Sequence, residues 1–403
     1  MKSLLLLVVL VSSLAAQSKN FVFVAGEPSH GYAAHEHRAG VMLLERLLKD
    51  AVPGVETQVF DQRWPSGDRL DAADALVIIS DGHNHIALPH LDQVTRRARD
   101  GMGVMLVHYS VDRPSDDGGD EIRQWIGGNY ERGFSVNPHW AADFNDIPEH
   151  PTTRGVASFQ MYDEWYFNMK FQPQMKGVTP ILSATPTLGV LMRKDGPHNG
   201  NPTVRASVKR GDTQHVAWAY ERPGGGRGFG FTGGHYHHSF GNKNFRRVLL
   251  NAVAWVGGVE VPAGGLPVGD ITAADLEANQ DYPREPGWEA EHGRILLGEA
   301  DPVFSGVAGK GGLEIEVVLK PREHPTVFLV TSDKAEWSDG WFSGPSGEQA
   351  PLGEEVVYKS IPEKNLQLYR TPKGATLFRA KGTSQGVKYM VFLSPPARRY
   401  LAQ

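Results

Sequence analysis

Short apolar runs alternate with amphipathic stretches over the first third of the chain. The runs are rich in valine, isoleucine, leucine and phenylalanine, as is typical of strands buried on both faces of a parallel sheet. The stretches between them repeat apolar residues at helical spacing, as Val41, Leu44 and Leu48 do. Predicted strands lie at 21–25, 55–60, 75–79 and 103–107, and predicted helices at 37–48, 88–100 and 120–126. This order predicts a doubly wound α/β fold with a mainly parallel sheet.

The pattern is less regular in the middle of the chain. Residues 129–158 are predicted to be a long loop, and an amphipathic helix at 242–256 is predicted to close the unit. Further strands are predicted at 159–167, 179–184, 189–192, 204–208, 215–220 and 227–232.

A segment rich in proline and glycine, residues 259–270, marks a boundary. Beyond it, strand-like runs are separated by glycine and proline turns with no helical stripes between them. These runs lie at 313–319, 326–331, 355–360, 366–369, 375–381 and 387–393. We therefore expect an α/β domain at 17–262, a linker at 263–285 and a small, mostly antiparallel β domain at 286–403.

The first residues have the pattern of a secretory signal peptide. Lys2 precedes an apolar run from Leu4 to Val11, and small residues follow up to Ala16. We expect cleavage near Ala16, and a secreted or periplasmic protein. The run is too short to span a bilayer, and no membrane span is expected elsewhere. A short membrane anchor or a buried strand is the alternative interpretation.

Composition excludes several classes of function. The chain has 403 residues, a net charge of −5 and no cysteine. Disulfides, a cysteine nucleophile and thiolate metal sites are therefore excluded, and no broad basic surface for nucleic acid is indicated. A metal would have to be held by histidine, aspartate, glutamate or water. The oligomeric state is left open.

Histidines gather just after the predicted strands. The loops beyond the carboxyl ends of strands in an α/β sheet share one crevice, where ligands bind. These histidines are therefore expected to converge at one candidate site. They are His30, His35, His37, His83, His85, His108 and His235, with His237 and His238 close behind.

Several motifs resemble the ThuA-like (trehalose utilisation) family. They are GEPSHGYAAHEHRAG at 26–40, VHYSVD at 107–112, WIGGNYERGFSVNPHW at 125–140, DEWYFNMKF at 163–171 and the segment from GRGFGFTGGHYHH to VEVP at 226–262. The resemblance covers about residues 20–262 and implies a class I glutamine amidotransferase-like, flavodoxin-like fold. In glutamine amidotransferases the turn after the fourth strand carries a cysteine nucleophile, but His108 stands at that position here. Glutaminase activity is therefore not expected. The family is linked to the breakdown of sugars, especially oxidised (keto) disaccharides.

The candidate catalytic residues are His108, Glu164 and His235, because imidazoles and carboxylates can exchange protons near neutral pH. His108 could instead cap the following turn, and Glu164 could form a structural salt bridge. Four aromatic residues could stack on sugar rings or belong to the core: Tyr109, Trp140, Trp165 and Tyr166. The candidate substrate-binding residues are His30, His37, Arg38, Asp81, Tyr109 and Trp165.

The histidines could also bind a divalent metal such as zinc. The candidate ligands are His30, His108 and His235, with His35 or His37 as substitutes for His30 and with Glu164 as a further ligand. The leading hypothesis is an exported enzyme that acts on an oxidised sugar by histidine and carboxylate acid–base chemistry, with or without metal assistance. The alternatives are a non-catalytic carbohydrate-binding protein on the same scaffold and an exported metal-binding or structural protein.

Overall fold

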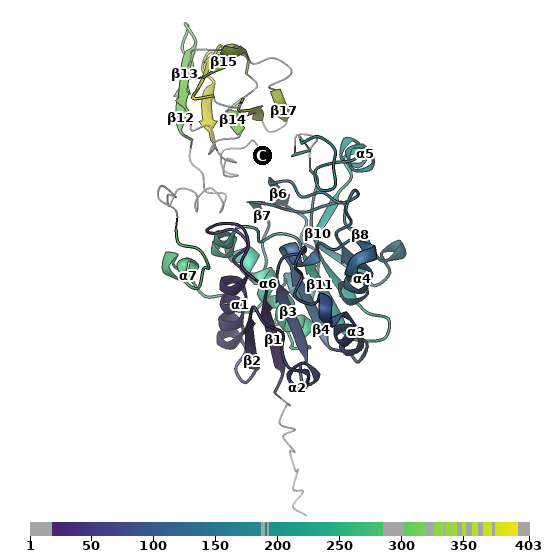
Figure 1. Ribbon diagram of the computed structural model, residues 1–403. Helices are drawn as coiled ribbons and strands as arrows, with labels where there is room; N and C mark the ends of the chain where they lie inside the picture. The colour runs from purple at the N-terminus through teal and green to yellow at the C-terminus, as the bar shows by residue number, and fades with distance from the viewer. Residues whose placement is uncertain are drawn as a thin grey trace, which may run out of the picture.

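Figure 1 shows the computed structural model of the chain. It describes residues 18–284 except 187–189 and 192, and then 302–319, 326–333, 335–344, 349–351, 357–361, 366–372 and 375–393. The predicted signal peptide, residues 1–16, lies outside the described residues. Within the described part, no helix combines the length and the hydrophobicity that crossing a membrane requires.

A seven-stranded sheet forms the centre of the N-terminal part, in the order β2-β1-β3-β4-β11-β10-β9. Its first five strands in that order run parallel, and the last two pairings are antiparallel. The strands are β1 (Asn20–Ala25), β2 (Glu56–Asp61), β3 (Ala75–Ile79), β4 (Gly103–Val107), β9 (Val178–Ala184), β10 (Gln214–Glu221) and β11 (Arg227–Phe231).

Helices cover both faces of this sheet (Figure 1). Alternate residues of β1 point to opposite faces, so Phe21 and Phe23 belong to one hydrophobic core and Val22 and Val24 to the other. The first core contains α1 (His37–Ala51) and α6 (Lys243–Val256), and the second contains α3 (Leu91–Arg99) and α4 (Asp120–Ile126). The predicted doubly wound, mainly parallel α/β fold is confirmed.

The carboxyl ends of four neighbouring strands lie in one row. Ala25 of β1 pairs with Ile79 of β3, Ile79 with Val107 of β4, and Val107 with Phe231 of β11. The segments that follow these four residues therefore begin side by side at one edge of the sheet.

Two sequence predictions for the middle of the chain are wrong. Residues 204–208, predicted as a strand, lie within α5 (Pro202–Arg210), which Asn201 caps with its side chain and Gly211 ends in a left-handed conformation. The predicted loop at 129–158 contains β6 (Trp140–Phe144), which pairs with β7 (Phe159–Asp163) in a separate hairpin.

The strand predicted at 159–167 is shorter in the structure, where β7 ends at Asp163. Part of the predicted strand at 189–192 lies outside the described residues, and the rest of it forms no strand. The remaining short elements are α2 (Gly67–Asp71), α7 (Ala273–Glu277), β5 (Gly128–Asn129) and β8 (Lys170–Phe171).

Residues 263–284, within the segment predicted to be a linker, pack against the α/β layers. Leu266, Val268 and Leu276 are buried in the same core as α1 and α6. The backbone N–H of Asp281 donates to Glu36 Oε2 at 2.7 Å. This segment therefore helps to hold the turn that leads into α1.

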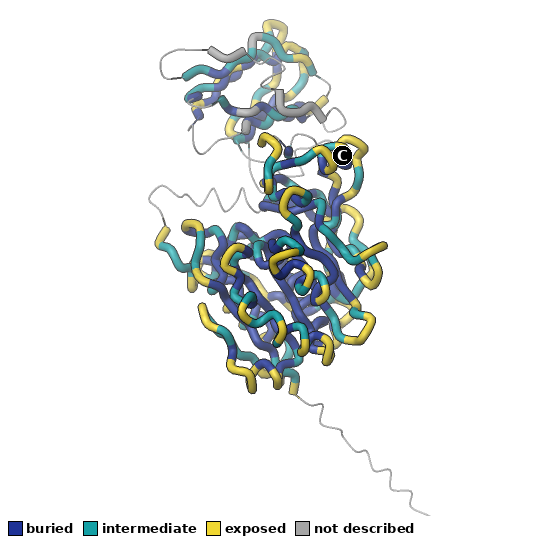
Figure 2. Tube along the Cα trace, turned by 45° about the vertical axis from the view of Figure 1, so that its right-hand side comes forward, coloured by how far each residue is buried: buried dark blue, intermediate teal, exposed yellow. Residues whose placement is uncertain are grey.

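Beyond residue 303 the described chain forms antiparallel sheets, as predicted. The five-stranded sheet has the order β12-β20-β14-β18-β17 and the four-stranded sheet β13-β19-β15-β16. One buried cluster contains residues from both, including Val327 and Phe378, so the two sheets form a sandwich. Figure 2 shows its buried interior in dark blue. The strands are β12 (Phe304–Val307), β13 (Leu313–Val318), β14 (Thr326–Thr331), β15 (Trp337–Ser343), β16 (Gln349–Pro351), β17 (Val357–Ile361), β18 (Leu366–Arg370), β19 (Leu377–Gly382) and β20 (Lys388–Phe392).

Candidate functional site

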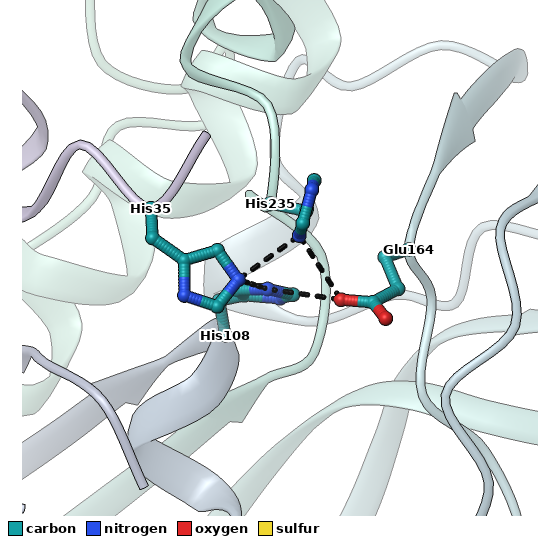
Figure 3. Close-up of side chains that lie close together, drawn as sticks. All are labelled: His35, His108, Glu164 and His235. Atoms are coloured by element: carbon teal, nitrogen blue, oxygen red, sulfur yellow. Dashed lines mark hydrogen bonds and ion pairs between the residues drawn. The ribbon is translucent and has the colours of Figure 1, made fainter. Parts of the chain in front are cut away.

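Three imidazoles and one carboxylate converge beyond the row of strand ends (Figure 3). One atom from each of His35, His108, Glu164 and His235 lies within 4.8 Å of the others. His35 Nε2 lies 2.9 Å from His235 Nδ1 and 3.1 Å from His108 Nε2. Glu164 Oε2 lies 3.0 Å from His235 Nδ1 and 3.5 Å from His108 Nε2. We call these four residues the strand-end cluster.

His108 occupies a strained turn directly after β4. Its φ is +55°, a value that residues other than glycine rarely adopt and that often marks a functional position. Its Nδ1 lies 2.7 Å from the carbonyl oxygen of Thr232 and therefore donates to it. The neutral ring then carries its proton on Nδ1, and Nε2 is left as an acceptor that faces the cluster, 3.2 Å from the hydroxyl of Tyr166.

His235 follows two glycines that shape the turn after β11. A Cβ at Gly233 would lie 2.3 Å from the Trp165 ring, and Gly234 has a φ of +101°. The buried carboxylate of Asp163 accepts from the backbone N–H groups of Gly234 and His235 at 2.9 and 3.1 Å. Asp163 therefore fixes the backbone of this turn and, with it, the position of the His235 ring.

Glu164 comes from the segment after β7 and is surrounded by histidines. Besides His108 and His235, it faces His139, whose Nε2 lies 3.6 Å from Oε1. Burial alone would raise the pKa of the Glu164 carboxyl, but the hydrogen bonds with His108 and His235 outweigh it and hold that pKa well below its usual range. The residue is therefore a carboxylate at neutral pH.

His35 lies in the segment between β1 and α1, with a φ of +53°. Its Nδ1 lies 3.0 Å from Asp81 Oδ1, so the proton on Nδ1 bonds to Asp81 and Nε2 faces the cluster. Ser29 Oγ donates to the same oxygen at 2.7 Å. Burial, followed by the neighbouring His108 and His235, holds the pKa of His35 well below its ordinary value, so this ring is neutral at pH 7.

Two further side chains lie next to the cluster, and one of them, His139, was missed by the sequence-based site prediction. His139 stands just before β6, in the region predicted to be a loop, and its ring lies 4.9 Å from that of His235. Burial lowers the pKa of His139 to about 4. Tyr166 is fully buried and bonds His108. The sequence placed His139 in the predicted loop at 129–158, and only the pairing of β6 with β7 brings it to Glu164.

Some of the predicted substrate-binding residues lie at the edge of the cluster. His30 is exposed and its ring lies 3.6 Å from that of His35. Half-buried Tyr109 lies 5.4 Å from the His35 ring. Asp81 orients His35, as described above. His30 also belongs to a second possible ligand group, with His35 and Asp81.

Other predicted site residues lie away from the cluster. Arg38 donates to the backbone of Asn279 and Gln280 and pairs with Asp281 at 3.1 Å, so it holds the segment after α7. Trp165 is fully buried in the core, where its Nε1 donates to the carbonyl of Met161. Its predicted role in binding substrate does not fit this position.

Of the remaining histidines near the strand ends, some form hydrogen bonds with the backbone and some line a small cavity next to the cluster. His37 donates to the carbonyl of Glu27 and is 3.5 Å from Asp81. His37 and His237 line a small cavity that also reaches His108. His85 is bonded to backbone groups, and His83 is exposed. His238 Nε2 lies 3.6 Å from Glu277.

The arrangement brings three imidazoles and a carboxylate to one point at the edge of a sheet. Such a set can accept and return a proton, polarise a bound carbonyl, or hold a cation. The first two of these functions need a substrate that reaches the edge of the cluster, where the side chain of His139 is 35% exposed.

One family model and several solved structures match the chain. A family model described as ThuA, trehalose utilisation, matches residues 22–256. No curated protein matches the chain. The crystal structure of a putative ThuA-like protein from Bacteroides uniformis is 19% identical, with a TM-score of 0.43, and the match covers 60% of this chain and 93% of that one. The glutaminase domain of Trypanosoma brucei CTPS is 10% identical, with a TM-score of 0.35 and coverage of 62% and 98%.

Proposed function

The chain belongs to the ThuA (trehalose utilisation) family, and on this premise we propose that it is an enzyme that acts on an oxidised (keto) sugar or disaccharide. The observation that carries the proposal is the convergence of His35, His108, Glu164 and His235 at the ends of neighbouring strands. The sugar is suggested by the family, and the acid–base chemistry is suggested by the cluster.

A ketone in a sugar ring acidifies the hydrogen on the adjacent carbon. When a base removes this proton, the bonding electron pair moves into a new carbon–carbon double bond and the ketone oxygen becomes an enolate. If the next carbon carries the glycosidic oxygen, the enolate returns to a ketone, the carbon–carbon double bond moves to that next carbon, and its bond to the glycosidic oxygen breaks. The departing oxygen takes a proton from an acid. The site must therefore stabilise charge on the ketone oxygen and supply a base and an acid.

The strand-end cluster is suited to stabilise the charge on the ketone oxygen. A histidine beside the cluster is suited to remove the proton. The side chains of Glu164 and His108 are only 9% and 3% exposed, so a substrate reaches neither of them easily. His139 is neutral at pH 7 and more accessible. A proton on its Nδ1 would bond the hydroxyl of Tyr236, 3.0 Å away, and leave Nε2 free to accept. We therefore assign proton removal to His139.

A panel of 3-keto glycosides and their parent disaccharides, incubated with the full-length protein, tests this function. We expect loss of at least one keto glycoside and no reaction of the parents, which lack the acidified hydrogen. Glu164→Gln should lower turnover by roughly 10²–10⁴-fold if the carboxylate acts in the reaction. Binding of a sugar from the panel without any turnover would favour a non-catalytic carbohydrate-binding protein instead.

We also propose that the protein is exported, because residues 1–16 have the charge and hydrophobic pattern of a signal peptide. N-terminal sequencing of the protein made in its own cells would test this. A mature chain that starts near residue 17 is expected, whereas an intact Met1 or Lys2 start in the cytoplasm would contradict it.

A further inference from the structure

We propose that the strand-end cluster binds one first-row divalent cation, with Nε2 of His35, Nε2 of His108, Nδ1 of His235 and a carboxylate oxygen of Glu164 as ligands. We take zinc as the example of such a cation in the argument and in the test. The ligand geometry stands independently of the substrate, but the role of the cation in the reaction rests on the proposed function.

The outer nitrogens of two rings are fixed in the way that metal-binding histidines require. His35 Nδ1 bonds to the carboxylate of Asp81, and His108 Nδ1 bonds to the carbonyl of Thr232. Bonds of this kind set the tautomer, turn the second nitrogen toward a metal and increase its basicity. Both Nε2 atoms consequently present lone pairs to the same point.

The inner atoms are acceptors held closer to one another than acceptors prefer. His35 Nε2 and His108 Nε2 are 3.1 Å apart, although each ring carries its proton on the other nitrogen. A proton on His235 Nδ1 can bond to His35 or to Glu164, 2.9 and 3.0 Å away, but cannot satisfy both fully. A cation at the centre, taking the place of that proton, would be bound by lone pairs of all four atoms at once.

The spacing fits a small cation. Ligands at ~2.0–2.1 Å from a tetrahedral zinc lie ~3.3 Å from each other. Four of the separations between the cluster atoms run from 2.9 to 3.5 Å, and all four atoms lie within 4.8 Å of one another. Three imidazoles and one carboxylate suit zinc and its neighbours in the first transition row better than magnesium or calcium.

Charge and burial also favour a cation. Glu164 is 7% exposed and its ion pairs are with His108, His139 and His235. A buried carboxylate is stabilised by a positive charge close to it. A divalent ion would supply it and could polarise the ketone oxygen of a bound substrate. His139 Nε2, 3.6 Å from Glu164 Oε1, would remain free to take the proton.

A second group shares His35 but uses His30 and Asp81, and it gives the competing location. There Asp81 Oδ1 already accepts from Ser29 and His35, and His30 is exposed. Asp81 therefore acts as a positioning residue in our assignment and as a ligand in the alternative. This difference makes the two locations separable by mutation.

The test is metal content and affinity of the full-length protein, stripped with a chelator and dialysed against zinc chloride. We expect one bound zinc, which His108→Gln and Glu164→Gln each reduce to less than a tenth of an equivalent. His30→Gln and His139→Gln should retain one equivalent, and Asp81→Asn should retain it with roughly 10–100-fold weaker affinity. Circular dichroism of each variant, and the visible spectrum of the cobalt-loaded protein, separate loss of a ligand from loss of folding.

Two outcomes would overturn the assignment. One is no zinc in the folded wild-type protein. The other is loss of zinc in His30→Gln and Asp81→Asn with retention in Glu164→Gln, which would move the ion to the competing group. Turnover of a keto glycoside by metal-free protein would contradict only the role of the cation in the reaction, and would leave the zinc site and the proposed function standing. Tight zinc binding without turnover of any sugar in the panel would support the zinc site and contradict the proposed function.

Discussion

His85 and His108 both follow buried strands of the central sheet, β3 and β4, and they are 3% and 2% exposed. Both nitrogens of the His85 ring form hydrogen bonds with the backbone. Nε2 donates to the carbonyl of Ser110 at 3.0 Å, and Nδ1 accepts from the N–H of Ala87 at 3.1 Å. His108 gives only Nδ1 to the backbone, at Thr232. Its Nε2 is left to face His35 and Glu164. A histidine at a strand end is therefore a site residue when one ring nitrogen remains after the local backbone has been satisfied.

The largest difference should appear when both histidines receive the same substitution. His108→Gln should lower turnover of a keto glycoside by roughly 10²–10⁴-fold and abolish zinc binding, because it removes the inward-facing acceptor. His85→Gln is the matched control, and it should leave turnover and zinc binding within about twofold of the wild-type values. Steady-state kinetics and elemental analysis on the two variants check this. Equal losses in both would show that burial, and not the free nitrogen, sets the effect.

A second comparison separates His139 from His108 within the site. His139→Gln should lower kcat by roughly 10²-fold or more, because it removes the proposed proton acceptor, while one equivalent of zinc remains bound. Parallel measurement of kcat and zinc content tests this. If His139→Gln turned over substrate normally, the base would have to be another group of the site.

Asp81 tests how far the orientation of the outer nitrogen matters. Asp81→Asn keeps the size of the side chain but removes the negative charge that holds the Nδ1 proton of His35. Zinc affinity should fall by roughly 10–100-fold, with the stoichiometry unchanged. Competition with a chelator of known affinity measures the shift. An unchanged affinity would mean that Asp81 does not act through His35.

Sequence patterns were sufficient for the central sheet because its strands are buried on both faces. The runs at 75–79 and 103–107 have the predicted bounds, and their continuous apolar residues leave few alternatives. The strand predicted at 204–208 failed for a local reason. Its β-branched residues suggested a strand, but Asn201, Pro202 and Gly211 are strong signals for the start and end of a helix, and they prevailed.

The sequence placed histidines at the strand ends but could not choose among them. His30, His35 and His37 lie within one segment, and the left-handed conformation of His30 and His35 decides which ring turns inward. His35 reaches His108, while His30 covers it from outside and His37 bonds Glu27 behind it. Side-chain direction in an irregular segment depends on contacts with distant strands, and a single sequence carries no record of these.

Trp165 and His139 show that distance along the sequence does not predict which residues reach the site. Trp165 is among the predicted substrate-binding residues because an aromatic ring could stack on a sugar, yet β7 ends at Asp163 and the Trp165 ring is buried in the core. His139 was treated as part of a loop, yet β6 brings it to Glu164. Neighbours in sequence diverge at a chain turn, and residues far apart meet through a hairpin.

The smallest expected effect concerns His85 and the stability of the fold. His85→Gln can keep one of the two backbone bonds, so it should lower the free energy of unfolding at pH 8 by about 1–2 kcal/mol. Burial lowers the pKa of His85 from 6.5 to about 4. Between these values the unfolded chain binds a proton that the folded chain does not, so the contribution of His85 is fully present above pH 6.5 and is lost as the pH falls toward 4.

The difference in stability between wild type and His85→Gln should therefore narrow as the pH is lowered through this window. Urea unfolding of the zinc-free proteins at pH 8, 6 and 5 measures it without a contribution from the cation. The comparison of one variant with wild type at each pH cancels the titration of other buried histidines, which lies in the same range. A difference that stayed constant or grew on acidification would mean that His85 is not held neutral by its backbone bonds, and the contrast with His108 would lose its basis.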